Sequence, residues 1–235
     1  MMKLAGFAVH LFTGLGAVCA LFAVMAVFDA SLGAAFLWLG AAFLIDGLDG
    51  PLARAVDVKA QLPRFSGEVI DLVIDYLTYV FVPVLLLVHE GRLPAGVATH
   101  GLAALILLSS LFHFADAASK ARDLAFVGFP AIWNVVAFYV FALDLGHGTT
   151  ALLVLVCVAA TFVPMHWVHP VRVVPLRPVT LSLTAVWAIA AFVTALNGFP
   201  AETWAQAALV GVALYGLGVS AWLSRRGNGT GADAA

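Results

Sequence analysis

Charged residues are scarce in this sequence. They make up only 10% of the 235 residues, whereas 63% are hydrophobic. A soluble domain of this length needs far more polar surface to cover its core, so the composition excludes that class. The apolar residues also come in runs of about twenty, the length that spans a hydrocarbon core of roughly 30 Å. We therefore predict an all-α, polytopic membrane helix bundle.

Cysteines, repeats and low-complexity stretches are rare as well. Cys19 and Cys157 each lie inside an apolar run, a pattern typical of small core residues rather than of a disulfide framework. No internal repeat is visible. The tail at 227–235 is the one low-complexity stretch, and we expect it to be disordered beyond a single membrane domain at 1–226. The run at 4–28 is too long for a signal peptide, so we interpret it as the first membrane helix.

Glycine, proline and charged residues divide the chain into about eight candidate transmembrane helices. The fifth is short, because it runs only from Pro130 to Gly146. An even number of spans puts both termini on one side of the membrane. The predicted spans lie near residues 4–28, 31–55, 67–89, 95–118, 130–146, 149–169, 178–197 and 201–223.

Positive charges are distributed unevenly between the two sides that these spans define. Of the 11 lysines and arginines, only Arg92 lies on the side opposite the termini. Cytosolic loops of membrane proteins carry the excess of lysine and arginine, so the termini and the even-numbered loops are predicted to be cytosolic. The residues on that side are Lys3, Arg54, Lys59, Arg64, Lys120, Arg122, Arg172, Arg177, Arg225 and Arg226.

Four aspartates lie near the cytosolic ends of the second and third predicted spans. Asp46 and Asp49 are three residues apart, and Asp71 and Asp75 are four apart, so each pair lies on one helical face. The two helices are antiparallel. At a rise of about 1.5 Å per residue, Asp46 and Asp75 lie about 12 Å inside their helices, and the other two lie about 6–8 Å inside. We expect the four carboxylates to converge in one small volume.

Four carboxylates inside a membrane are costly, at roughly 2.5–3.5 kcal/mol each at a helix centre even on lenient scales. Bound cations relieve this cost. Oxygen-only ligands suit Mg²⁺ or Mn²⁺, and two such ions would neutralise the group. An intramembrane cation transporter is the alternative from another class. Transporters bind near the membrane midplane within repeats, whereas this group is near one surface and no repeat is visible.

Two glycines and an arginine accompany the aspartates. Gly50 and Gly67 weaken their helices relative to alanine, which indicates a close backbone approach to a bulky ligand. Arg54 carries a permanent charge that suits a phosphate group.

The segment 46–75 resembles the signature of the CDP-alcohol phosphotransferases. That signature reads D-x-x-D-G-x-x-A-R, a spacer, then G-x-x-x-D-x-x-x-D. The spacer here has twelve residues, 55–66, where many members have eight. All eight fixed positions match, and they are Asp46, Asp49, Gly50, Ala53, Arg54, Gly67, Asp71 and Asp75.

The resemblance implies a phosphotransferase in which an alcohol oxygen attacks the diacylglycerol-linked phosphorus of CDP-diacylglycerol and CMP leaves. It implies Asp75 as the catalytic base. Two Mn²⁺ or Mg²⁺ ions would be held by Asp46, Asp49, Asp71 and Asp75. The nucleotide would be bound by Asp49, Gly50, Ala53, Arg54 and Gly67.

Three secondary motifs resemble the bacterial branch of this family that uses choline as the acceptor: LPRFSGE (62–68), GFPAIWN (128–134) and HPVRV (169–173). Aromatic faces recognise a quaternary ammonium, and we select Tyr79 and Trp133 as candidate choline contacts. Serine or a glycerol phosphate remains an alternative acceptor. The resemblance implies a multi-pass protein of the bacterial inner membrane, with its active site in the cytosol, the lipid bilayer as its surroundings, no nucleic-acid partner and a possible homodimer.

Overall fold

The computed structural model describes residues 2–116, 126–163, 166–167 and 176–227. These residues form a helical bundle with one pair of two-residue antiparallel strands, so the predicted all-α class is confirmed. The elements are α1 (Met2–Phe28), α2 (Leu32–Ala55), α3 (Val58–Gln61), α4 (Gly67–Asp75), the π-helical turn η1 (Tyr76–Phe81), α5 (Val82–His89), α6 (Val97–Ala115), β1 (Phe126–Val127), α7 (Trp133–Ala142), α8 (His147–Thr161), β2 (His166–Trp167), α9 (Arg177–Asn197) and α10 (Thr203–Gly227).

Six of the described helices are long and apolar enough to cross a membrane, which makes this a multi-pass membrane protein. One of them is continuous from Gly67 to His89 and comprises α4, η1 and α5. The predicted fifth and sixth spans correspond to α7 and α8, which have only 10 and 15 residues. The number of eight spans therefore stays a prediction.

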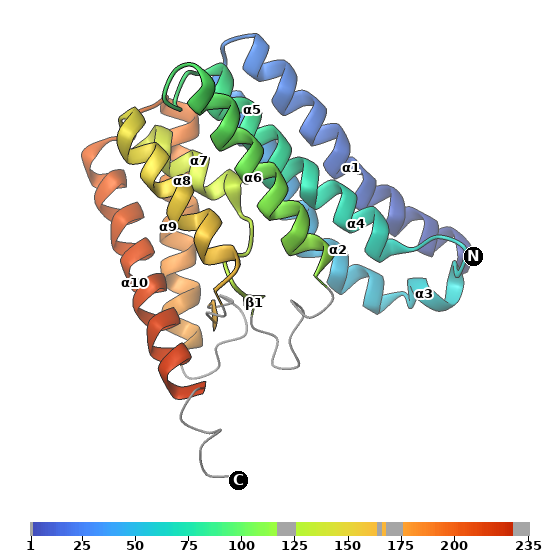
Figure 1. Cartoon of the computed structure of the whole chain (residues 1–235). Coiled ribbons are helices and arrows are strands. Elements are labelled where there is room, and N and C mark those ends of the chain that lie inside the picture. The colour runs from blue at the N-terminus through green and yellow to red at the C-terminus, as the bar shows by residue number, and fades with distance from the viewer. Residues whose placement is uncertain (1, 117–125, 164–165, 168–175, 228–235) are drawn as a thin grey trace.

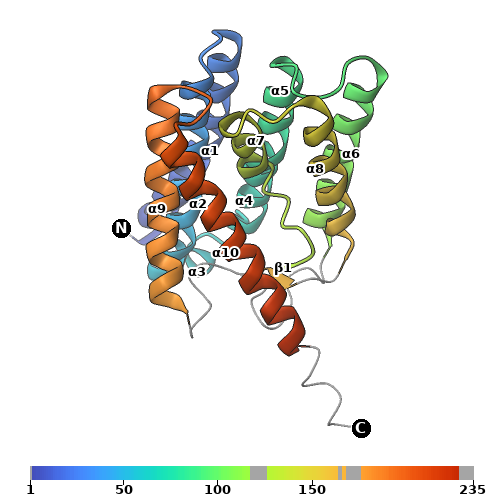
Figure 2. The ribbon, with the colours of Figure 1, turned by 90° about the vertical axis from the view of Figure 1, so that its left-hand side faces the viewer.

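Four hairpin turns lie together at one end of the bundle (Figures 1 and 2). They join α1 to α2, α5 to α6, α7 to α8 and α9 to α10. The Arg92 guanidinium, beside the second turn, donates to the Asp144 carboxylate beside the third at 2.6 Å. The Ala201 amide, beside the fourth, donates to the Ala142 carbonyl at 2.9 Å. The cross-links fix the register of three helical hairpins at this end.

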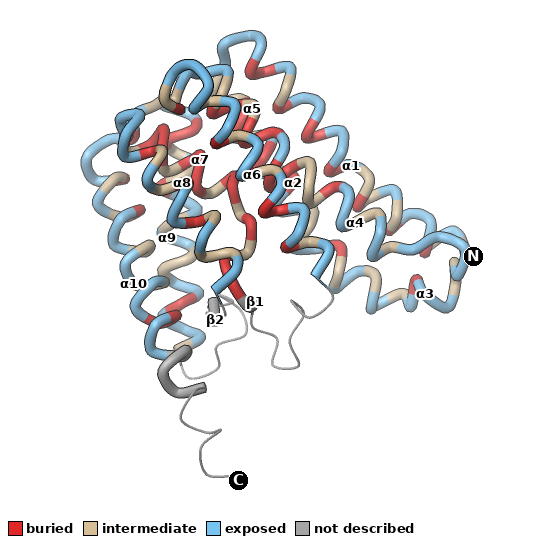
Figure 3. The backbone as a smooth tube through the Cα atoms, in the orientation of Figure 1, coloured by how far each residue is buried: buried red, intermediate tan, exposed pale blue. Residues whose placement is uncertain are grey.

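The short helix α7 forms the centre of the core. Eight of its ten residues are buried, and its Trp133 and Phe141 are among the largest fully buried side chains. Around it the buried residues follow the inward faces of the helices (Figure 3). Many of the exposed residues are large and apolar. Because protein rather than lipid encloses α7, its length is not tied to the thickness of the bilayer.

An irregular segment leads into α7. Gly128 and Ala131 have positive φ angles of 84° and 54°, and both are buried. A Cβ at Gly128 would lie 2.3 Å from the Thr161 carbonyl oxygen, so only glycine permits this approach to α8. The Phe129 amide donates to the Ala160 carbonyl at 3.0 Å. Within a membrane, non-helical backbone is tolerated where it is buried in protein or lines a water-filled cavity, and this segment is buried.

Candidate metal and substrate site

Three of the four predicted aspartates form a compact group between α2 and α4. Each of Asp46, Asp49 and Asp71 offers one carboxylate oxygen, and these three oxygens lie within 4.8 Å of one another. Asp49 is buried, with 8% of its surface exposed, and the other two are half-buried. Three converging carboxylates are an oxygen donor set that suits a hard divalent cation.

Asp75, the fourth predicted aspartate, adjoins this group through Asp46, with whose side chain it interacts. Asp46 also interacts with Asp49 on its own helix. The helical rise predicts that Asp46 is level with Asp75 and that Asp49 is level with Asp71. The interaction between Asp46 and Asp75 agrees with the first of these pairs, and the second pair stays a prediction. That Asp75 also serves as a metal ligand stays a prediction.

Tyr79 holds Asp46 from the opposite helix. Its hydroxyl donates a hydrogen bond to Asp46 Oδ2 at 2.7 Å, and only 8% of its surface is exposed. Its ring packs edge-on against Phe43, with the centroids 6.1 Å apart. A buried hydroxyl on a carboxylate fixes the orientation of that carboxylate, as outer partners of metal ligands do.

The π-helical turn η1 sets the position of Tyr79. In this turn the Val82 amide donates to the Leu77 carbonyl, five residues back, instead of four. Pro83 follows this turn directly. In a regular α-helix a proline lacks the N–H for the backbone hydrogen bond, and its ring clashes with the carbonyl four residues earlier. Here that carbonyl belongs to Tyr79. The wider turn accommodates that clash, and π-helical turns occur frequently at functional sites.

A polar pocket of about 570 Å³ lies beside the aspartates, among α1, α2, α3 and the start of α4. Asp49 and Asp71 line it directly, as do Lys59 and Thr13. The structure thus brings together all the residues predicted to bind the nucleotide, because the pocket lining includes Asp49, Gly50, Ala53, Arg54 and Gly67.

Both signature glycines lie under another side chain. A Cβ at Gly50 would lie 3.4 Å from Arg54 Nη1, so the guanidinium lies close over the backbone at Gly50. A Cβ at Gly67 would lie 3.0 Å from His10 Cε1, tighter than an ordinary contact. Gly67 therefore makes room for the His10 ring, whereas the sequence predicted room for a ligand.

His10 also lines the pocket, and it is not among the residues predicted from the sequence. Its Nε2 atom is buried and has no hydrogen-bond partner among the described residues. The available signal was its spacing, since Val9, His10 and Thr13 on α1 all line the polar pocket. A histidine on an apolar helix is a weak signal until the facing helix is known.

The two candidate choline contacts have different surroundings. Tyr79 adjoins the aspartates, as described above. Trp133 is completely buried, donates from Nε1 to Ser110 Oγ at 2.8 Å and packs against the Phe129 ring. Choline contact by either residue stays a prediction. The motif at 169–173 and most of the tail at 227–235 lie outside the described residues.

Comparisons with known proteins identify relatives by sequence but no similar solved structure. No protein-family model matches the chain, and no solved structure matches it significantly. Phosphatidylcholine synthase of Bradyrhizobium diazoefficiens is 45% identical over 215 residues, covering 91% of this chain and 80% of that protein. The Pseudomonas aeruginosa phosphatidylcholine synthase is 46% identical over 187 residues, covering 80% and 78%. That of Agrobacterium fabrum is 39% identical over 220 residues, covering 92% and 90%. At these identities over most of both chains, the protein belongs to the phosphatidylcholine synthase family.

Proposed function

We propose that the protein transfers the phosphatidyl group of CDP-diacylglycerol to choline and releases CMP. The observation that carries this proposal is the group of Asp46, Asp49 and Asp71, whose carboxylate oxygens converge within 4.8 Å beside a polar pocket. Membership in the family supports choline as the acceptor.

The reaction is a displacement at phosphorus. The choline hydroxyl oxygen forms a new bond to the diacylglycerol-linked phosphorus. The bond from this phosphorus to the oxygen that bridges it to the CMP phosphate breaks, and CMP leaves with the electron pair. The hydroxyl proton passes to a carboxylate, for which we propose Asp75, because it adjoins the group through Asp46.

The aspartates fit a pair of divalent cations, for which we propose Mn²⁺ or Mg²⁺ held by Asp46, Asp49, Asp71 and Asp75. Such ions would neutralise the pyrophosphate and the charge that develops on the leaving oxygen. Tyr79 orients Asp46 toward this task through its hydrogen bond.

The remaining pocket residues bind and orient the donor. Arg54, which lies over Gly50, supplies a planar guanidinium for the pyrophosphate oxygens. Ala53 has a small side chain that leaves space for the nucleotide, and Gly67 lines the same pocket where it admits the His10 ring. For choline we propose the ring of Tyr79, since it is next to Asp46; a contact with Trp133 would require the enclosed core around it to open.

We also propose that the pocket and both termini face the cytosol. The supporting observation is that ten of the eleven basic residues fall on that side. The surrounding membrane would be the bacterial inner membrane.

The test is an assay of the purified protein with CDP-diacylglycerol and Mn²⁺ or Mg²⁺. Choline, serine and glycerol 3-phosphate are offered in parallel, and the lipid product and CMP are measured. We expect phosphatidylcholine and CMP in equal amounts with choline alone. Product from serine only would keep the reaction class and overturn the acceptor, and no CMP with any acceptor would overturn the reaction.

A further inference from the structure

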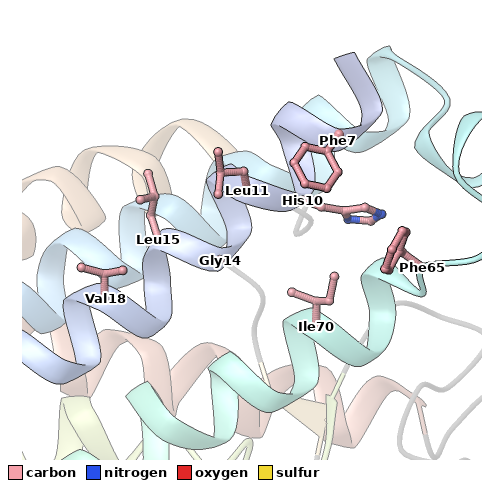
Figure 4. A pocket seen from close by; sticks show the side chains of 8 residues that line it. All are labelled: Phe7, His10, Leu11, Gly14, Leu15, Val18, Phe65 and Ile70. Atoms are coloured by element: carbon pink, nitrogen blue, oxygen red, sulfur yellow. The ribbon is translucent and has the colours of Figure 1, made fainter. Parts of the chain in front are cut away.

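An apolar groove of about 330 Å³ runs along the outer side of α1 and α4 (Figure 4). Leu11, Leu15 and Val18 of α1 form one wall. Phe65, which precedes α4, and Ile70 in its first turns form the other. The leucine and valine side chains of α1 are among the large apolar residues exposed on the surface of the bundle.

Two glycines of α1 shape this groove. A Cβ at Gly16 would lie only 2.5 Å from Ile74 Cγ2, so α1 and α4 touch there and close the inner side. At Gly14 an added Cβ would have no atom within 4 Å, and this residue lines the groove. The missing side chain at Gly14 therefore leaves part of the hollow.

The groove joins the polar pocket. His10 and Phe65 line both, and Figure 4 shows the His10 ring between the rings of Phe7 and Phe65. The buried Nε2 atom of His10 lacks a hydrogen-bond partner among the described residues, although an unsatisfied polar atom is costly in apolar surroundings. From this junction the groove extends eight residues along α1 to Val18, about 12 Å. The polar pocket, the His10 ring and the apolar groove follow one another in space. This order matches the order of the parts of an amphiphilic ligand, from its polar head to its apolar chain.

We propose that this groove binds one acyl chain of the CDP-linked donor lipid, with His10 at the junction beside the glycerol esters or phosphate. This assignment rests on the proposed function. The donor's nucleotide would then occupy the polar pocket, and its chain would leave sideways between α1 and α4 into the bilayer.

The groove acts by positioning. A chain that moves from lipid into an apolar groove gains little hydrophobic free energy, because both surroundings are apolar. Binding of the chain instead holds the reacting phosphorus in a fixed orientation beside the aspartates. Such orientation raises the rate of the transfer step. The ratio of kcat/KM for a long-chain over a short-chain donor therefore measures whether the groove binds the acyl chain.

The test compares Gly14→Leu with a matched control, Gly40→Leu. Gly40, on α2, is equally open, with no atom within 4 Å of an added Cβ, and lines neither the groove nor the pocket. CMP release is measured with a dioleoyl and a dihexanoyl CDP-linked donor. We expect the ratio of kcat/KM for the long over the short donor to fall roughly tenfold in Gly14→Leu, about 1.4 kcal/mol, and to keep its wild-type value in the control.

An unchanged ratio, or equal loss with both donors, would overturn the groove assignment. A Gly14→Leu variant that instead separated a dimer into monomers would identify the groove as an interface and would also overturn it. Failure of the proposed function is separate, since it would appear as no CMP release by the wild-type protein from either donor.

A binding measurement tests whether the acyl chain of the donor occupies the groove, and it requires no turnover. A CDP-linked lipid with a diazirine in its acyl chain should label α1 within residues 7–18, and excess unlabelled donor should prevent this labelling. A phosphatidylglycerol probe with the same chain serves as the control. Equal labelling by both probes would mean that bulk lipid fills the groove, and the assignment would fail.

Discussion

Replacing Tyr79 with phenylalanine isolates one hydrogen bond at the proposed metal group. The change removes only the hydroxyl that donates to Asp46 Oδ2 at 2.7 Å. The ring keeps its edge-on contact with Phe43, and no cavity larger than one oxygen atom is created. Asp46 therefore loses its buried donor while the fold around it is retained.

The magnitude follows from the kind of bond that is lost. A hydrogen bond to a charged group contributes about 1.5–3 kcal/mol. Removal of an outer partner of a metal ligand typically costs about 10–100-fold in metal affinity or activity. We expect the dissociation constant for Mn²⁺ to rise by a factor in that range. The KM for choline at saturating Mn²⁺ should stay unchanged, because the aromatic ring remains.

The assay is a titration of purified, metal-stripped protein with Mn²⁺, in which the free ion is quantified by electron paramagnetic resonance. Tyr76→Phe is the matched control, because Tyr76 belongs to the same π-helical turn but donates to the Leu107 carbonyl at 2.9 Å. Wild-type affinity for Mn²⁺ in Tyr79→Phe would refute the positioning role. Equal loss of affinity in both variants would attribute the effect to the turn as a whole.

Three further predictions concern the metals, the base and the helix packing. Chelation with EDTA should abolish CMP release, and added Mn²⁺ or Mg²⁺ should restore it; full activity in EDTA contradicts metal dependence. Asp75→Asn should lower kcat by at least about 10²-fold while the other three aspartates still bind Mn²⁺, and wild-type turnover in this variant would exclude Asp75 as the base. Gly33→Ala should lower the melting temperature in detergent, because its Cβ would lie 2.3 Å from the Ala195 carbonyl oxygen, and overpacking costs about 1–3 kcal/mol. Gly40→Ala, at an open position, should match the wild type or exceed it slightly, and equal losses at both positions would rule out the clash as the cause.

The membrane class and the aspartate group could be predicted from the sequence because both depend on local properties. The length of an apolar run is set by the bilayer, and the spacings of three and four residues fix one helical face. The pairing of Asp46 with Asp75 followed from the rise of two antiparallel helices.

The central helix and the π-helical turn depend on packing across the bundle. A ten-residue helix such as α7 resembles a short span in sequence, although protein rather than lipid surrounds it. No prediction from the sequence concerned Pro83, and a proline alone does not distinguish a π-helical turn from a kink. The bond from Tyr79 to Asp46 joins residues 33 positions apart, and it requires both helices to be placed first.

The glycines show the same limit. The sequence marked Gly67 as a place of close approach, but the neighbour is His10, on a helix that no short-range pattern connects to it. Gly14 and Gly16 look alike in the sequence. One lines an open groove and the other touches Ile74, and only the position of α4 separates the two cases.

The central claim is that the group of Asp46, Asp49 and Asp71 holds the divalent ions on which phosphatidyl transfer to choline depends. The most direct measurement is the rate of CMP release from CDP-diacylglycerol and choline as Mn²⁺ is titrated into metal-stripped protein, with the wild type and Asp71→Asn side by side. We expect a saturable rise from zero in the wild type and no measurable release in Asp71→Asn. A wild-type rate independent of Mn²⁺, or an Asp71→Asn titration that coincides with the wild type, would contradict it.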